Sequence, residues 1–179
     1  MPLLFLNLAT IFMLIVVLLM LSTALMNLFI RVPYVPSNMR VVRKVVEIAD
    51  IKDGEKVYDL GCGDGRLLLE AEKKAKIDAE GYELASIPYL IAHFKKFLHH
   101  SRMHIFMKNF FNVDLKNADV IFCYLGTETM QKLAEKFRKE CKKGTRIISH
   151  TFQLKGFTPV KVIAKNRETR LPSIYIYQI

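Results

Sequence analysis

Apolar residues occupy almost the whole of the first thirty positions, and the pattern changes after them. No Asp, Glu, Lys, Arg or His occurs before Arg31. At about 1.5 Å per residue, a helix over residues 3–30 would reach about 40 Å, which exceeds the roughly 30 Å hydrocarbon core of a bilayer. A domain of the remaining length could hardly bury such a segment on all its faces. The pattern therefore predicts one transmembrane helix, with residues 1–30 as an anchor.

Basic residues follow this segment, whereas only the amino terminus precedes it. They are Arg31, Arg40, Arg43 and Lys44. A cleaved signal peptide would carry its basic residues before a shorter apolar run, so we expect a retained anchor. Because positive charge favours the cytoplasmic side, the sequence predicts a single-pass membrane protein whose remaining domain, residues 31–179, is cytoplasmic.

Beyond the anchor, short apolar runs alternate with amphipathic stretches. The prolines of residues 32–36 predict a stiff, extended connector, and Ser37 is placed to cap a helix over residues 39–49. The predicted strands are 57–60, 79–83, 105–108, 119–124 and 146–152, and the further helices are 66–74, 88–98 and 127–141. Strands that alternate with helices indicate βαβ units.

The end of the chain departs from this alternation. After Gly156, residues 160–165 and 174–177 are strand-like runs joined by a polar segment that contains Pro172, which predicts a closing antiparallel hairpin. The expected fold is therefore α/β: a Rossmann-like, seven-stranded, mainly parallel sheet with helices on both faces, preceded by the transmembrane helix.

Charge is confined to the second part of the chain. All 27 Lys and Arg and all 17 Asp and Glu lie in residues 31–179, so this domain carries the whole net charge of +10. Attraction to anionic lipid headgroups accounts for such a surface without a specific site, and charge alone does not exclude nucleic acid. Cys62, Cys123 and Cys141 are too widely spaced for a zinc site or a disulfide framework, so we expect no metal and a reducing compartment.

A glycine-rich turn follows the first predicted strand of the domain. Its glycines, Gly61, Gly63 and Gly65, have the spacing G-x-G-x-G, whereas a dinucleotide fingerprint has its third glycine one position later. Asp59 and Asp64 flank the turn, and carboxylates suit a ligand with a cationic amine and a sulfonium better than a pyrophosphate. The turn therefore favours S-adenosylmethionine as the cofactor.

Two further strand ends carry residues that suit this cofactor. Glu83 ends the second predicted strand, where a carboxylate can accept hydrogen bonds from both ribose hydroxyls. Asn109 follows the third strand and could bond the adenine amino group, while a phenylalanine beside it, Phe110, could cover the base. The candidate cofactor-binding residues are Ser37, Asp59, Gly61, Cys62, Gly63, Glu83, Asn109 and Phe110.

Several motifs resemble one known family. They are V-P-Y-V-P at 32–36, Y-D-L-G-C-G-D-G-R at 58–66, G-Y-E-L at 81–84, N-F-F-N-V-D at 109–114 and G-T-R-I-I-S-H-T-F at 144–152. The chain is similar over nearly all of residues 32–179 to class I, seven-strand methyltransferases, and within them to the protein-lysine methyltransferases that include a broad-specificity archaeal enzyme and membrane-anchored mitochondrial relatives.

The resemblance implies roles for particular residues. Asp59, Gly61, Gly63 and Glu83 would contact the cofactor, and Asn109 would face its adenine. The acceptor site would be bordered by Tyr34, Leu125 and Glu128, which are the candidate catalytic residues. The chain departs from the family pattern in having Ser37-Asn38 for Thr-Pro, Phe157 for a tryptophan, and Gly126 for a bulkier residue beside the acceptor site.

The implied chemistry is methyl transfer to a lysine amine, which must be unprotonated to react in line with a sulfonium methyl. Tyr34, Tyr124, Phe152 and Phe157 could line the acceptor channel, although each could equally be a core aromatic. Glu128 and His150 are the nearest titratable groups, and neither is assigned as a general base.

We expect a monomeric, membrane-anchored methyltransferase with a protein substrate, membrane proteins included. Nucleic acid is not expected as a partner, because residues 125–128 lack the Asn/Asp-Pro-Pro-aromatic stretch of amino-base methyltransferases. Two alternatives stay open: a methyltransferase of a lipid or small hydrophobic molecule, and a non-catalytic module that keeps the cofactor fold.

Overall fold

Seven strands form one sheet in the order β3-β2-β1-β4-β5-β7-β6. The computed structural model describes residues 2–30 and 35–179, with side chains left out for 2–6, 23 and 26–30. The strands are β1 (Lys56–Leu60), β2 (Asp78–Glu83), β3 (His104–Met107), β4 (Val120–Cys123), β5 (Arg146–His150), β6 (Lys161–Ile163) and β7 (Ile174–Gln178). The first five are parallel, whereas β7 runs antiparallel to β5 and β6. The predicted mainly parallel sheet with a closing antiparallel hairpin is confirmed.

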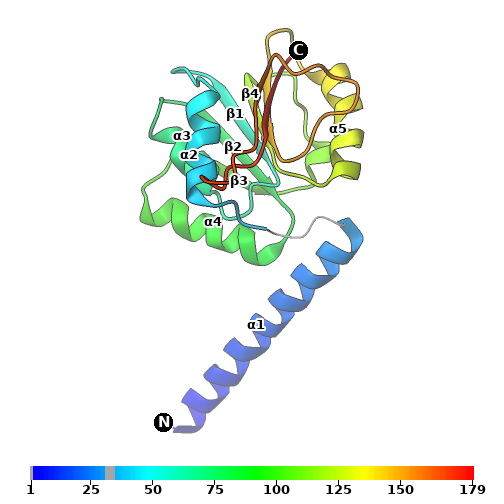
Figure 1. Cartoon of the computed structure of the whole chain (residues 1–179). Helices are drawn as coiled ribbons and strands as arrows, with labels where there is room; N and C mark the ends of the chain where they lie inside the picture. Colours follow the sequence, from blue (N-terminus) through cyan, green and yellow to red (C-terminus); the bar gives the residue numbers. More distant parts are fainter. Residues whose placement is uncertain (1, 31–34) are drawn as a thin grey trace.

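Helices cover both faces of the sheet (Figure 1). They are α2 (Met39–Ile48), α3 (Arg66–Glu72), α4 (Ser86–Leu98), the short 3-10 helix η1 (Phe110–Asn112) and α5 (Thr127–Glu140). Alternate strand residues point to opposite faces: Val57 packs in a core with α2, α3 and α4, while its neighbour Tyr58 packs in a second core with α5. Burying an apolar side chain of this size stabilises a fold by about 1.5–3 kcal/mol.

α2 begins at Met39 as predicted, but its N-cap differs from the prediction by one residue. Asn38, not Ser37, is the N-cap, and its side-chain oxygen accepts a hydrogen bond from the Arg40 amide at 2.9 Å. Ser37 instead points to the carboxyl end of the sheet, where its hydroxyl lies 3.2 Å from Nε2 of His150. The connector therefore reaches the candidate site through Ser37.

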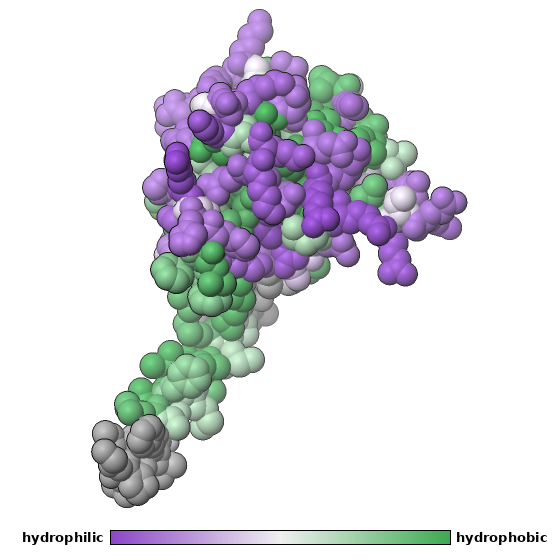
Figure 2. All heavy atoms as spheres, turned by 90° about the vertical axis from the view of Figure 1, so that its left-hand side faces the viewer, coloured by the Kyte–Doolittle hydropathy of each residue, from purple (hydrophilic) through white to green (hydrophobic). Residues whose placement is uncertain are grey.

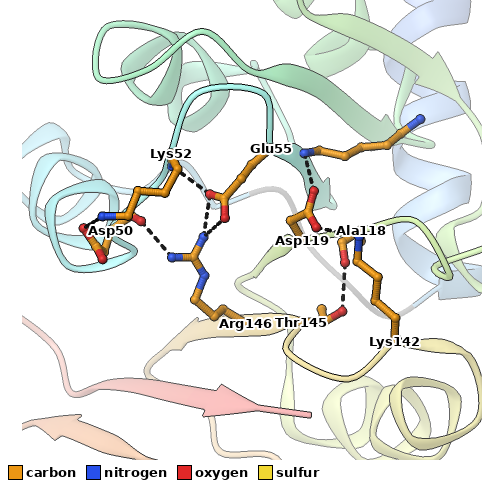
Figure 3. Close-up of polar contacts among 9 residues, drawn as sticks. Asp50, Lys52, Glu55, Ala118, Asp119, Lys142, Thr145 and Arg146 are labelled. Atoms are coloured by element: carbon orange, nitrogen blue, oxygen red, sulfur yellow. Dashed lines mark hydrogen bonds and ion pairs between the residues drawn. The ribbon is translucent and has the colours of Figure 1, made fainter.

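The amino ends of the strands are held by ion pairs (Figure 3). The Arg146 guanidinium donates to the Glu55 carboxylate at 2.5 and 2.6 Å and to the Asp50 carbonyl at 2.7 Å. Lys142 pairs with Asp119 at 2.5 Å. These contacts join the segments before β1, β4 and β5, at the edge of the sheet opposite the glycine turn, so we interpret them as structural.

The predicted apolar segment is one helix, α1 (Pro2–Ile30), which projects from the domain (Figure 1). Its described apolar side chains are largely exposed, with Phe12 at 69%. It contacts α4, where the hydroxyls of Ser22 and Ser86 lie 2.9 Å apart. Among the described residues, no helix has the length and apolar character needed to cross a membrane, and the transmembrane assignment stays a prediction.

Candidate functional site

A cleft opens at the carboxyl ends of β1, β2 and β4, with about 990 Å³ of empty space that is partly open to solvent. The neighbours β1 and β4 are the point where the strand order reverses, which is where open α/β sheets bind their ligands. Residues of the glycine turn, the ends of β2, β4 and β5, η1 and the connector line this cleft.

The glycine turn brings backbone to the floor of the cleft. Gly61, Gly63 and Gly65 all have positive φ, at 79°, 56° and 74°, a conformation that side chains disfavour. A Cβ on Gly61 would lie 3.0 Å from Cδ2 of Leu125. The turn is fixed to β2 because the amides of Gly61 and Cys62 donate to the Tyr82 carbonyl at 2.9 and 3.1 Å.

Gly81 on β2 is a further position, outside the turn, where the site requires glycine. A Cβ there would lie 2.8 Å from Sγ of Cys62 and 2.9 Å from Cδ1 of Ile105. Only glycine therefore lets β2 approach the turn this closely. In the sequence, Gly81 is only the first residue of the G-Y-E-L motif, and nothing there explains why this position is a glycine.

Three carboxyl groups, those of Asp59, Asp64 and Glu83, lie at the cleft. Burial raises the pKa of Asp59 to about 8, and the neighbouring carboxylates of Glu83 and Asp64 add to the effect. Asp59 is buried at the cleft wall, and Glu83 lies at the end of β2. A cationic group bound beside them would relieve this repulsion, as expected for the ammonium and sulfonium of S-adenosylmethionine.

Asp64 is already neutralised by two cations. Although burial opposes it, hydrogen bonds from Arg66 and Lys95 lower the pKa of Asp64 to about 2. The Arg66 guanidinium binds both carboxylate oxygens, at 2.8 and 2.6 Å, and also donates to the Ser37 carbonyl at 2.7 Å. Asp64 therefore joins α3, α4 and the connector, and we do not assign it to the cofactor.

Glu83 orders the backbone on both sides of the cleft. One carboxylate oxygen accepts from the Gly63 amide at 3.0 Å, and the other accepts from the amides of Leu84 and Ala85 at 2.9 and 2.7 Å. A carboxylate offers about four acceptor sites, and the three amides use three of them, so one site remains for a ribose hydroxyl while these contacts are kept.

His150 and Tyr124 form the wall at the ends of β4 and β5. Their rings stack with centroids 3.9 Å apart, and Phe152 packs against Tyr124 at 5.9 Å. Burial lowers the pKa of His150 to about 4, so the imidazole is neutral at pH 7. The wall is therefore uncharged and largely aromatic.

Covalent and metal chemistry have little support in this cleft. Burial raises the pKa of the Cys62 thiol, and the nearby Asp59 carboxylate adds to the effect, so the thiol stays protonated and is a poor nucleophile. Within the described part of the chain, no group of three His, Cys, Asp or Glu side chains is placed to hold a metal ion.

Most of the predicted site residues meet in this cleft. Those that line it are Ser37, Asp59, Gly61, Cys62, Gly63, Glu83, Phe110 and Leu125. Asn109 does not line it, since its side-chain oxygen caps η1 by accepting from the Phe111 amide at 3.0 Å. Glu128 lies outside as well, in a shallow groove on α5, and Tyr34 lies outside the described residues.

The structure adds residues to the predicted set. The sequence indicates Tyr124 only as a possible wall and His150 only as a nearby titratable group, and both line the cleft. Phe157, another candidate wall, packs instead against Tyr177 and under Arg138. The signal for Tyr124 and His150 is their position directly after β4 and at the end of β5.

The donor set of the cleft fits S-adenosylmethionine. Glycines leave room for backbone contact, Asp59 and Glu83 supply carboxyl groups whose ionised form a bound cation favours, and Phe110 supplies an apolar surface. This combination accepts a ligand that is cationic at one end and aromatic at the other.

Comparisons with known proteins agree with this assignment. Residues 59–161 match the family described as ANTKMT methyltransferase domain. The chain is 38% identical over 151 residues to a protein-lysine N-methyltransferase of Saccharolobus islandicus, with 83% of this chain and 94% of that protein covered. It is 29% identical over 150 residues to the mouse adenine nucleotide translocase lysine N-methyltransferase, with 78% of this chain and 61% of that protein covered.

A solved structure shows the same fold with a product-like ligand. It is an RNA methyltransferase from Salinibacter ruber in complex with S-adenosyl-L-homocysteine, 25% identical, with a TM-score of 0.75 over 81% of this chain and 94% of that one. The chain therefore belongs to the ANTKMT methyltransferase domain family and is an S-adenosylmethionine-dependent methyltransferase.

Proposed function

We propose that the chain methylates lysine side chains of proteins and does so at a membrane. The observation that carries the proposal is the 38% identity with a protein-lysine N-methyltransferase along 94% of that relative, together with a cleft whose acceptor wall is uncharged. S-adenosylmethionine supplies the methyl group, and the chain's own residues have to hold the two partners in line.

The acceptor wall suits a neutral amine. Deprotonating a lysine of pKa about 10.4 at pH 7.4 costs on the order of 4 kcal/mol in water. A wall of half-buried Tyr124 and buried, neutral His150 disfavours the charged ammonium, which reduces this cost. A histidine of pKa about 4 is a weak base, so we assign His150 to positioning, and the lysine proton leaves to solvent.

The cofactor end of the site has its own residues. Asp59 and Glu83 hold the cationic end and the ribose, the amides of the glycine turn contact the rest of the ligand, and Phe110 covers the base. Ser37 borders the acceptor end through its contact with His150. The sequence adds Tyr34 to that end.

Membrane attachment is supported by the amino-terminal segment. Thirty residues without charge precede a domain of net charge +10, and the described apolar side chains of α1 are exposed. A substrate lysine near a membrane surface would then lie within reach of the cleft.

The experiment is to incubate the full-length protein with methyl-labelled S-adenosylmethionine, native membranes and total RNA. We expect label in protein, released on hydrolysis as methyl-lysine. Asp59→Ala should abolish labelling. Glu128 lies outside the cleft, so Glu128→Gln should retain labelling. Label that appears only in lipid or only in RNA would contradict the lysine assignment.

A further inference from the structure

The outer face of α4 is apolar. Pro88 and Ala92 are buried on its inner side. The opposite side carries Leu90, Ile91, Phe94, Phe97 and Leu98, all exposed. Phe94 is 61% exposed and Phe97 is 74% exposed. The spacing of three and four residues places these side chains on one stripe of the helix, where a helix surrounded by water would carry polar residues.

The apolar surface continues beyond α4. β3, an edge strand of the sheet, contacts α4 and exposes Met107, whereas its neighbour Phe106 stacks on Tyr82 at the other face of the sheet. α1 lies on the other side, against Ser86 at the start of α4. Figure 2 shows hydrophobic surface at the end of the domain that adjoins α1. Contiguous exposed apolar patches usually mark an interaction site.

The charge around this surface is positive. The sequence of α4 contains no acidic residue, and Lys95 and Lys96 lie in its last turn. Exposed basic residues follow both apolar elements: His99, His100 and Arg102 after α4, and Lys108 after β3. A helix with Leu and Phe on one face and basic residues beside it is typical of segments that lie in the headgroup region of a membrane.

We propose that the outer face of α4, with Met107 of β3, rests in the headgroup boundary of an anionic lipid bilayer beside α1. Lipid fits better than a second copy of this chain, because a second copy would bring the same cations against each other, whereas anionic headgroups neutralise them. The inference deepens the proposed membrane attachment and rests on it.

The position of α4 has a consequence for the site. The helix begins directly after Ala85, which lines the cleft and donates to Glu83. Lys95, in its last turn, pairs with Asp64 of the glycine turn. A bilayer under α4 therefore lies beside the cleft and restricts acceptors to lysines near the lipid surface.

The chain contains no tryptophan, so single tryptophans can report on this face. We would reconstitute the full-length variants Phe94→Trp and Phe97→Trp in phosphatidylglycerol-containing vesicles with brominated acyl chains. The matched control is Val162→Trp, which replaces an exposed apolar residue on β6, at the other edge of the sheet. We expect a blue shift and at least about twofold stronger quenching at 94 and 97 than at 162, and less of both in purely zwitterionic vesicles.

Four outcomes would overturn the proposal in different ways. Equal quenching at 94, 97 and 162 would mean that α4 does not contact lipid. A blue shift that depends on protein concentration in detergent, without quenching by brominated lipid, would assign the face to a second copy. Vesicle flotation separates the two proposals: a chain that does not float refutes membrane attachment itself, while a chain that floats with unquenched tryptophans refutes only the role of α4.

Discussion

The raised pKa of Asp59 makes a quantitative prediction for cofactor affinity. With a pKa of about 8 in the free protein, only about one carboxyl in a hundred is ionised at pH 6. A cation bound beside Asp59 favours the ionised form, so binding releases a proton and affinity rises with pH. Between about pH 6 and 7.5, the ratio of total to ionised Asp59 carboxyl falls from about 100 to about 4, so the dissociation constant should fall about 25-fold, or about 1.9 kcal/mol.

Asp59→Asn is the variant that tests this reasoning. It keeps the shape of the side chain but cannot ionise, so its affinity should be weak and nearly independent of pH over this range. The assay is calorimetric titration with S-adenosylmethionine in buffers of different ionisation enthalpy, which also counts released protons. The α-amino group of the ligand also titrates, near pH 7.7–8.0. Because Asp59→Asn cannot ionise, the pH dependence of affinity that remains in this variant measures the contribution of the ligand's amino group.

Unfolding of the free protein provides a second test, because the contribution of Asp59 to stability should fall with rising pH, whereas cofactor affinity should rise. The folded-state pKa of Asp59 lies above its unfolded value of 3.8, so its contribution is fully present below about pH 4 and is lost as pH rises through about 8. Asp59→Asn should therefore be more stable than the natural chain at pH 8. Equal pH dependence of cofactor affinity in both proteins would refute the placement of Asp59 beside the cation.

Three further predictions concern other parts of the molecule. Gly61→Ala should weaken cofactor binding at least about tenfold, because a Cβ at positive φ costs about 1–2 kcal/mol and meets Leu125; calorimetry decides, and unchanged affinity would contradict the role of the turn. Arg146→Ala should lower the free energy of unfolding by about 1–3 kcal/mol in denaturant titrations while cofactor affinity stays the same, and a changed affinity would show that the amino-end ion pairs reach the site. His150→Gln should lower turnover more than cofactor affinity. The folded pKa of His150 is about 4 against 6.5 in the unfolded chain, so its contribution to stability is complete above about pH 6.5 and is lost as pH falls towards 4. Thermal unfolding of the His150→Gln variant should not show this loss.

The fold could be predicted because its signals are local. Each buried strand is a short apolar run and each covering helix has an amphipathic period, so the alternation gives the βαβ order without any knowledge of contacts. The pairing of β4 with β5 is not local, and it is this pairing that brings Tyr124 against His150. No pattern within either strand indicates that these two rings will stack.

The helix cap predicted at Ser37 is wrong, and the adenine contact predicted for Asn109 stays a prediction; both concern small polar side chains beside a helix start. Small polar side chains bind nearby backbone amides as readily as a ligand, so their type does not reveal their partner. Ser37 and Asn38 are both good caps, and only the direction in which the chain enters α2 decides that Asn38 takes the cap and Ser37 reaches His150. Asn109 uses its oxygen for the Phe111 amide, which the sequence leaves equally open.

α4 shows why an apolar period does not reveal which side of a helix is covered. Its sequence, SIPYLIAHFKKFL, is apolar on most of its circumference, and the position of the sheet alone decides that Ala92 faces the core while Phe94 and Phe97 face outward. The same helix contacts the cofactor cleft at both ends, through Glu83 at its start and through Lys95 and Asp64 near its end. A shift of α4 relative to the sheet would therefore move both carboxylates, so whatever covers the outer face of α4 also bears on the geometry of the cofactor cleft.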